Sequence, residues 1–440
     1  MTITHSHHLN NRRLIKSTAS AAAVCVENLG WWKTAVNEIQ SWPEYTCQPL
    51  RALPNAANSL GVGNIFVKDE SKRFGDSLGS FKALGAPYAV FSILADEVFR
   101  QTGVRPSSTE LRSGKHAAVT RNVTVCVATD GNQGRGLAYG AKIFGYRCVD
   151  YIHSHYEESV RRAREDAHMN GWHFVSSTSW SDFDESIPET VMNAYMVVVE
   201  ETLQMLPCVG DITHVFVCGG VGSIAAAVFM GLYKHFQELQ GLGYSVQIPR
   251  FVVIEPNQAD CLLQSAKAGE IRQSYGSLRT LMAGLAGRGP SPAAWKVLEW
   301  LASDFISVSD SFAVDGMRFL AEGCEGDIPV VCGESSAASM GLLLNSSSNK
   351  ALRKALGLDE HSHCLLFGLE GATDPQIYEE LVGCTPETVF EVQKKFLATQ
   401  IESLLIILTL VVIFLQQRIF PDYWSDNFIS YQSICDPPLD

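Results

Sequence analysis

A lysine at position 82 lies among small and apolar residues in the stretch GSFKALG, residues 79–85. A lysine on a solvent-facing side of a helix is the usual explanation for one such residue. If the side chain is instead held in a pocket, desolvation lowers the pKa of its amine, and the neutral amine can form a Schiff base with a carbonyl compound. The heptapeptide alone leaves both interpretations open.

A glycine-rich turn follows a predicted strand in VFVCGGVGSIAAAV, where Gly219-Gly220-Val221-Gly222-Ser223 precedes a predicted helix. Glycines let the backbone turn so that several N–H groups point at one anion, and the start of the helix adds the positive end of its dipole. This arrangement suits a phosphate group. A dinucleotide site is an alternative, but the spacing is not GxGxxG and no acidic residue follows at the usual distance. A purely structural turn is the other alternative.

Two further polar segments stand at the starts of predicted helices. The stretch ATDGNQGRG, residues 128–136, places Asp130 and Asn132 after a predicted strand, where open α/β sheets bind ligands. An ordinary turn built from Asp, Gly and Asn explains the same residues. The stretch CGESSAASMG, residues 332–341, contains small hydroxyl residues and one carboxylate, and a capped helix start would account for it.

The elements that must position these residues alternate along the chain. Continuous apolar strands separated by helices predict parallel sheets covered on both faces. The N-terminal stretch MTITHSHHLNNRRLIKS, residues 1–17, is expected to form a mobile tail, with weak metal binding by its THSHH segment as the alternative. The predicted strands are 64–70, 123–130, 146–153, 173–177, 214–218, 250–256 and 363–371; the predicted helices are 80–100, 134–145, 157–171, 187–206 and 223–236, and 103–122 is predicted to be a polar loop.

Composition limits the function classes. The 440 residues suffice for two or three domains, and a net charge of −13 argues against a nucleic-acid-binding protein, which would carry a basic stripe. The twelve cysteines form no CxxC pair, which is typical of a reducing compartment. The N-terminus has no apolar core and is therefore not a secretory signal, so we expect a cytoplasmic protein.

The C-terminal residues 386–440 differ from the rest. The run SLLIILTLVVIFL, residues 403–415, has thirteen residues that are almost all apolar. It is shorter than the ~20 residues that cross a bilayer. A packed or poorly ordered appendage is the favoured interpretation, and a membrane anchor is the alternative.

Taken together, these segments resemble a known family. A lysine near the N-terminus, an Asp/Asn loop and a later glycine-rich turn are similar to the pyridoxal-phosphate enzymes of fold type II, the tryptophan-synthase β-subunit type. Within that group the chain resembles the diaminopropionate ammonia-lyases over residues 5–385. The similar segments, in order, are KDESKRFGDSLGSFKALG, ATDGNQGRGLAYGAKIFG, CGGVGSIAAAV, IEPNQADCL, TLMAGLAGRGPSPAAW, CGESSAA and LEGATDPQIY.

The resemblance implies a two-domain α/β fold with mostly parallel sheets, in which residues 1–87 and 205–385 form the larger cofactor domain and 88–204 a smaller mobile domain. It implies a cytoplasmic homodimer that binds pyridoxal 5′-phosphate and eliminates ammonia from 2,3-diaminopropionate, a small amino acid, to give pyruvate and ammonia. No metal site is expected.

The resemblance also implies roles for individual residues. Lys82 would hold the cofactor through a Schiff base, and Asp130 would be an acid/base carboxylate. Asn132 would donate to the 3′ oxygen of the pyridine ring. The other implied cofactor contacts are Phe81, Gly219, Gly220, Val221, Gly222, Ser223 and Thr373, and the implied substrate contacts are Ser80, Ser177, Glu334 and Ser335.

The chain departs from the family pattern at several places: the segment before Lys82 is two residues longer and has Gly79 where an asparagine is common, AGRGP at 286–290 replaces a segment with a cysteine and a glutamate, and two departures affect the site directly. Ser177 stands where the family has a second catalytic aspartate, and Leu369 stands where relatives carry a threonine near the pyridine nitrogen. Thr373 is a candidate substitute for the missing hydroxyl. These changes keep two alternatives open: a serine or threonine dehydratase on the same scaffold, and a pseudoenzyme that binds the cofactor without catalysis.

Overall fold

The computed structural model describes residues 5–11, 32–75, 78–128, 131–151, 156–179 and 186–419 of the chain. The chain divides into two compact units, Met1–Val389 and Phe390–Asp440. Every motif with candidate chemistry lies in the first unit.

The first unit contains a seven-stranded sheet with the strand order β1-β9-β8-β7-β10-β3-β2. The five inner strands run parallel, and the edge strands β1 and β2 pair antiparallel with their neighbours. Parallel strands are buried on both faces, which explains the continuous apolar runs in the sequence. The strands are β1 (His5–Leu9), β2 (Leu50–Ala52), β3 (Asn64–Asp69), β7 (His214–Cys218), β8 (Arg250–Pro256), β9 (Asp304–Val308) and β10 (His363–Gly368).

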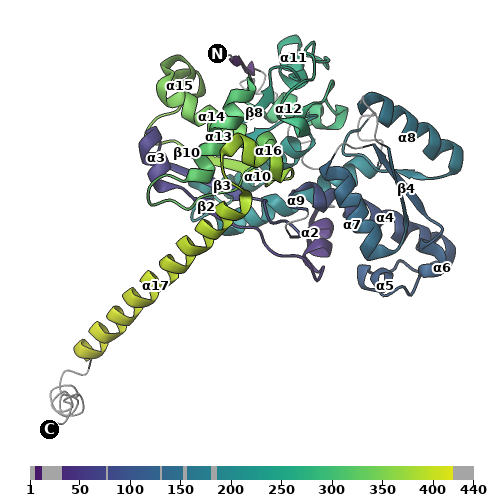
Figure 1. Ribbon diagram of the computed structural model, residues 1–440, viewed down its shortest axis with the longest axis horizontal. Coiled ribbons are helices and arrows are strands. Elements are labelled where there is room, and N and C mark those ends of the chain that lie inside the picture. Colours follow the sequence, from purple (N-terminus) through teal and green to yellow (C-terminus); the bar gives the residue numbers. More distant parts are fainter. Residues whose placement is uncertain are drawn as a thin grey trace, which may run out of the picture. The chain divides into compact units, whose positions relative to one another are not determined.

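A second, three-stranded parallel sheet has the order β5-β4-β6. Figure 1 shows its central strand beside α7 and α8, and α7 packs in turn against α4. A small apolar cluster packs under α8, built from Cys126 and Ala128 of β4 and Val160, Ala163 and Ala167 of α8. The elements are β4 (Thr124–Ala128), β5 (Arg147–Tyr151), β6 (His173–Phe174), α4 (Lys82–Thr102), α7 (Asn132–Phe144) and α8 (Tyr156–Asn170).

One apolar core joins the two sheets. Helix α4 packs against α7 and α9, and its buried residues belong to the same cluster as those of α10 and the large sheet. Fully buried Phe229 and Phe251 stack with their ring centroids 4.7 Å apart in this core. The remaining helices are α2 (Trp32–Gln40), α3 (Pro54–Leu60), α9 (Ser186–Met205), α10 (Ser223–Gly241), α11 (Cys261–Ala268), α12 (Pro292–Leu301), α13 (Asp310–Glu322), α14 (Glu334–Ser348), α15 (Lys350–Leu356) and α16 (Pro375–Val382).

The fold confirms the predicted mixed α/β class with mostly parallel strands, and it corrects two local predictions. His5–Leu9 was expected to be a mobile tail, but it forms the edge strand β1 against β9, and the His7 Nε2 atom lies 2.7 Å from Asp304 Oδ1. The predicted polar loop 103–122 contains two short helices, α5 (Ser108–Arg112) and α6 (Ala117–Thr120). A capping box between Ser107 and Glu110 starts α5.

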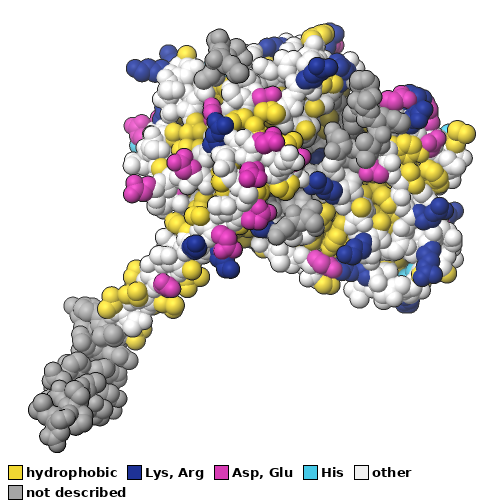
Figure 2. Space-filling view, viewed as in Figure 1, with side chains coloured by type: hydrophobic (Ala, Val, Ile, Leu, Met, Phe, Trp, Pro, Cys, Tyr) yellow, Lys and Arg dark blue, Asp and Glu magenta, His cyan; other side chains and the backbone are white. Residues whose placement is uncertain are grey.

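The apolar C-terminal run lies within a longer helix, α17 (Pro386–Ile419). Large side chains from Ile401 to Val412 are about half exposed or more, and Figure 2 shows them along the helix. The interpretation of residues 386–440 as a packed or poorly ordered appendage stays a prediction. Among the described residues, one helical stretch, Pro386–Val412, is long and apolar enough to cross a membrane, and an 18-residue window within it has a mean hydropathy of 1.8.

Candidate active site

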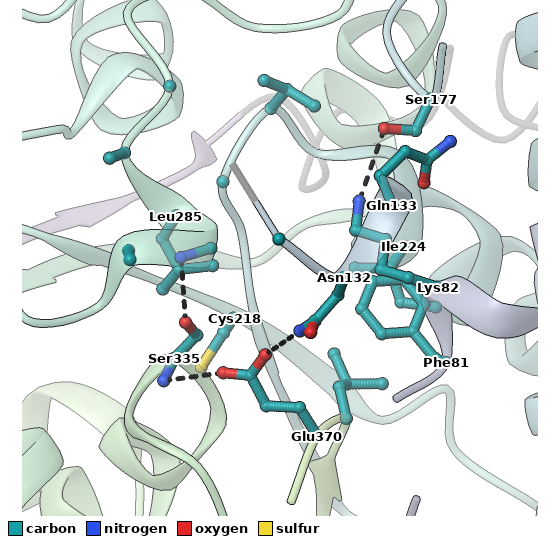
Figure 3. A pocket seen from close by; sticks show the side chains of 18 of the residues that line it. Phe81, Lys82, Asn132, Gln133, Ser177, Cys218, Ile224, Leu285, Ser335 and Glu370 are labelled. Carbon is teal, nitrogen blue, oxygen red and sulfur yellow. Dashed lines mark hydrogen bonds between the residues drawn. The ribbon is translucent and has the colours of Figure 1, made fainter. Parts of the chain in front are cut away.

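A cavity of about 320 Å³ lies in the first unit, and Figure 3 shows its lining. Its walls come from seven places in the chain: the start of α4, the start of α7, residues 175–178 after β6, the turn between β7 and α10, residues 283–287, the start of α14 and the segment after β10. Several of these segments follow strands of the two sheets, so loops at the strand ends meet here. The sequence-predicted residues that line the cavity are Phe81, Lys82, Asn132, Ser177, Gly219, Gly220, Val221, Ser223, Glu334, Ser335 and Thr373.

Lys82 is the first residue of α4, and its side chain extends into the cavity (Figure 3). Its Nζ atom lies 3.3 Å from Ser177 Oγ and 5.1 Å from the centroid of the Phe81 ring. The Phe81 ring is itself buried against Tyr195, with 4.8 Å between ring centroids. The amine is therefore held in a cavity by rigid neighbours instead of lying on a solvent-facing helix surface.

The glycine-rich turn forms a concave wall of the cavity. Gly220 and Gly222 have φ angles of +57° and +100°, which are unfavourable for other residues. A Cβ atom on Gly222 would lie 2.9 Å from Leu298 Cδ1, so the turn has no room for a side chain there. The first N–H groups of a helix have no acceptor from within the helix. In the 19-residue helix α10, no side chain caps them either. The turn therefore suits an anionic group such as a phosphate.

The hydroxyl of Ser223 connects this turn to the segment that carries Ser177. Ser223 Oγ donates to the carbonyl oxygen of Ser177 over 2.5 Å. Because this donor is used within the protein, the backbone N–H of Ser223 is the group that remains suited to an anion.

Asn132 and Glu370 form a hydrogen-bonded pair on another wall of the cavity. Asn132 Nδ2 donates to Glu370 Oε2 over 2.8 Å, and the Ser335 N–H donates to Glu370 Oε1 over 3.1 Å (Figure 3). Ser335 Oγ in turn accepts from the N–H of Gly284 over 3.1 Å. Glu370 was not among the predicted site residues, although the quoted segment LEGATDPQIY contains it.

Three carboxyl groups line the cavity, and two of them, Glu334 and Glu370, interact electrostatically. Burial and the nearby charge of Glu370 raise the pKa of Glu334 to about 7. Burial also raises the pKa of Glu370, while hydrogen bonds from Ser335 and the positive charge of Lys82 oppose this increase. At neutral pH this pair can hold a proton that a reaction in the cavity could use.

The amide of Gln133 is a feature that the sequence analysis missed. Gln133 lines the cavity, and both of its amide atoms are buried without a hydrogen-bond partner in the described structure. Buried amide atoms of this kind usually have a partner. A bound polar molecule in the cavity would supply one, so the lining fits a polar ligand.

Four other predicted positions are placed differently. Ser80 is buried and pairs with Glu370 in an antiparallel backbone bridge. Its Oγ accepts a hydrogen bond from the Lys82 backbone N–H over 3.3 Å, so Ser80 helps to fix the backbone of the lysine. Gly222 shapes the glycine turn without lining the cavity. Leu369 does line it, as an apolar wall. Asp130 lies outside the described residues.

Comparison with known proteins identifies similar chains. The family described as "Pyridoxal-phosphate dependent enzyme" matches residues 42–155 and 149–360. The chain is 34% identical to the diaminopropionate ammonia-lyase of Salmonella typhimurium over 407 residues, which cover 86% of this chain and 97% of that protein. Its fold is similar to the holo crystal structure of diaminopropionate ammonia lyase from Escherichia coli, with a TM-score of 0.73, 28% identity, and coverage of 87% of this chain and 97% of that one. The structure of the Escherichia coli protein in complex with D-serine gives a TM-score of 0.72 at 28% identity, with 86% and 97% covered.

Proposed function

This chain belongs to the pyridoxal-phosphate dependent enzyme family, and we propose that it is an ammonia-lyase that converts 2,3-diaminopropionate to pyruvate and ammonia. The observation that carries the proposal is the cavity in which the Lys82 amine, Asn132 and the glycine-rich turn meet. The relatives named diaminopropionate ammonia-lyase support the choice of substrate.

The residues around the cavity suit pyridoxal phosphate. The phosphate would bind the N–H groups of Gly220, Val221 and Ser223, since the N–H groups of Gly219 and Gly222 already donate to backbone carbonyls. Lys82 would bind the aldehyde carbon, Phe81 would contact the ring, and Asn132 would donate to the 3′ oxygen.

The pyridine nitrogen needs a neutral partner, which Leu369 cannot supply. Thr373 lines the cavity and is one candidate. Ser336 is a second candidate, because it also lines the cavity and its Oγ accepts from the N–H of Leu369 over 3.0 Å, which leaves its own O–H available to donate. Replacing each hydroxyl separately, as Thr373→Val and Ser336→Ala, and comparing cofactor affinity would identify the partner.

The chain's own groups would handle protons around the substrate. When bound, the cofactor supplies an electrophilic carbon for amines and a ring that accepts the electron pair left when Cα loses its proton. Lys82 and Asp130 would take and return the Cα proton. Glu334 could donate a proton to the β-amino group as it leaves, because its pKa is raised to about 7 by burial and by Glu370.

The proposal includes location, assembly and domain organisation. We place the protein in the cytoplasm as a homodimer; the ten cysteines of the described residues are all free thiols, which fits a reducing compartment. Residues 88–204 would form the smaller mobile domain, and residues 1–87 with 205–385 the larger one. Membrane attachment through α17 is not part of the proposal, and fractionation of cells that express the full chain would test this.

The test of the proposed function uses the purified full-length protein. Its absorbance should show the visible band of a Schiff base, and Lys82→Ala should abolish that band after dialysis. Pyruvate and ammonia release should be assayed with both isomers of 2,3-diaminopropionate and, in parallel, with serine and threonine. A visible band with faster turnover of serine or threonine would favour the dehydratase, and a band without any turnover would favour the pseudoenzyme.

A further inference from the structure

Glu370 is the residue that the contacts of the cavity single out beyond the predicted set. Its backbone forms the bridge opposite Ser80, and the neighbouring bond from the Phe81 N–H to the Leu369 carbonyl, over 3.0 Å, fixes the strand end beside the lysine. The Glu370 side chain is 5% exposed and reaches both the start of α14 and Asn132. It therefore contacts three of the segments that form the cavity.

The donors around the Glu370 carboxylate determine how the Asn132 amide is turned. When the proton of the carboxyl pair is on Glu334, Glu370 is a carboxylate and has only acceptor atoms, and its Oε1 accepts the backbone N–H of Ser335. Oε2 accepts from Asn132 Nδ2 over 2.8 Å, so the amide presents its nitrogen, and not its carbonyl oxygen, to Glu370. The Asn132 nitrogen carries a second N–H, which remains for a ligand in the cavity.

We propose that Glu370 is a positioning residue that orients the Asn132 amide so that its second N–H donates to the 3′ oxygen of the bound cofactor. This inference rests on the proposed function, because it uses the contact between Asn132 and pyridoxal phosphate. The inference makes the contact between Asn132 and the 3′ oxygen depend on Glu370, although Glu370 itself does not touch that oxygen.

The substitution Glu370→Gln tests the orientation without changing the size of the side chain. The Ser335 N–H is a fixed donor, so the introduced glutamine must turn its carbonyl oxygen toward Ser335 and its amide nitrogen toward Asn132. Asn132 must then offer its oxygen in return, and the donor aimed at the 3′ oxygen is replaced by an acceptor. Because a hydrogen bond to a charged group is lost, we expect the apparent Kd for pyridoxal phosphate to rise by about ten- to a hundredfold.

The experiment is a double-mutant cycle read by titrating the apo form of the full-length protein with pyridoxal phosphate. E370Q and N132A should each weaken binding, and the double variant should bind no more weakly than the weaker single variant, since Glu370 acts through Asn132. The pH midpoint of the visible band should shift in E370Q and N132A alike. Glu334→Gln is the matched control, because it removes a carboxyl from the same cavity, and its effect should be the same with and without N132A.

Several results would overturn the proposal. If E370Q weakens binding as much in the N132A background as in the unmodified protein, Glu370 acts independently of Asn132. If E370Q leaves the Kd unchanged, or if N132A does, the orientation has no role in binding. An unmodified protein that binds no pyridoxal phosphate would instead overturn the proposed function itself. If E370Q does not fold, Glu370→Asp, which withdraws the carboxylate by one methylene, allows the same cycle.

Discussion

The replacement of an acidic residue by Ser177 predicts a strong preference for one substrate isomer. The two isomers of 2,3-diaminopropionate present the Cα proton on opposite sides, so each needs its own base. By resemblance to the family, Asp130 would serve the D-isomer, and an aspartate at the position of Ser177 would serve the L-isomer. A serine hydroxyl has no basic form near neutral pH, so we expect the unmodified protein to favour the D-isomer and Ser177→Asp to raise activity on the L-isomer.

The structure limits the size of this effect. A general base contributes about 10²–10⁴-fold to the rate. The Ser177 carbonyl accepts from Ser223 Oγ, which holds residue 177 at the cavity and keeps a new carboxylate near the substrate. The same carboxylate would lie near Lys82, whose Nζ is 3.3 Å from Ser177 Oγ, and would stabilise the protonated amine. Because the protonated amine is the less reactive form, we expect a gain near the lower end, about hundredfold.

The assay is the release of pyruvate from each isomer, expressed as kcat/KM. Ser177→Asn is the matched control, since it has nearly the same shape as aspartate but no basic group. Comparable kcat/KM values for the two isomers in the unmodified protein would refute the reasoning. They would show that Lys82, or Asp182 from the part of the chain outside the described residues, serves as the second base. Equal effects of S177D and S177N would also refute it.

Three further predictions follow from the surrounding structure. Gly222→Ala should destabilise the protein by about 1–2 kcal/mol or more and weaken pyridoxal phosphate binding, because φ at this position is +100° and the added Cβ has no room. Thermal unfolding would measure the loss of stability, and titration with pyridoxal phosphate would measure the loss of affinity. An unchanged melting temperature would contradict the predicted backbone strain. Burial raises the pKa of Asp304, but hydrogen bonds from His7 and Arg250 outweigh it, and the net pKa is lowered. The stabilisation that the Asp304 carboxylate provides is present at pH values above its pKa in the unfolded chain, and it is lost as the pH falls through its lower pKa in the folded protein. Asp304→Asn should therefore reduce the free energy of unfolding by about 1.5–3 kcal/mol at pH 7 and by little in strong acid. An equal cost at both pH values would be inconsistent with this linkage. Truncation after Val389, a buried residue at the end of the first unit, should keep the visible band and raise solubility, and loss of the band would show that α17 is needed for the fold.

The sequence predicted those parts of the fold that local patterns determine. Alternating apolar strands and helices predicted most of the parallel elements, and small residues followed by an apolar periodic run predicted α4 and α10 close to their observed starts. Strand β1 was missed because HSHHL is polar, and its partner β9 lies about three hundred residues further on. Its pairing depends on contacts such as the one between His7 and Asp304, which no local window of sequence contains.

The candidate site divides in the same way. Lys82 and the glycine turn carry their chemistry in residue type and local spacing, so they could be predicted. Glu370 and Gln133 could not, because a glutamate after a strand and a glutamine at a helix start are ordinary surface residues by composition. The importance of Glu370 depends on its burial and on the donors that face it, which come from α14 and α7. That of Gln133 depends on the burial of an amide that has no partner in the described structure. A buried carboxylate next to a lysine segment is recognisable only once the chain is folded.

The two departures from the family pattern change side chains but leave the backbone contacts around the cavity in place. Ser177 lacks a base, yet its carbonyl still accepts from Ser223 of the glycine turn. Leu369 lacks a hydroxyl, yet its N–H donates to Ser336 and its carbonyl accepts from Phe81. Because the backbone at both positions is held by these bonds, the shape that binds the cofactor does not depend on the missing groups. Proton transfer does depend on the base that Ser177 lacks, so turnover should vary independently of cofactor affinity when residue 177 is changed. A pseudoenzyme and a working lyase would therefore differ in kcat while binding pyridoxal phosphate with similar affinity, and only the two measurements together can distinguish them.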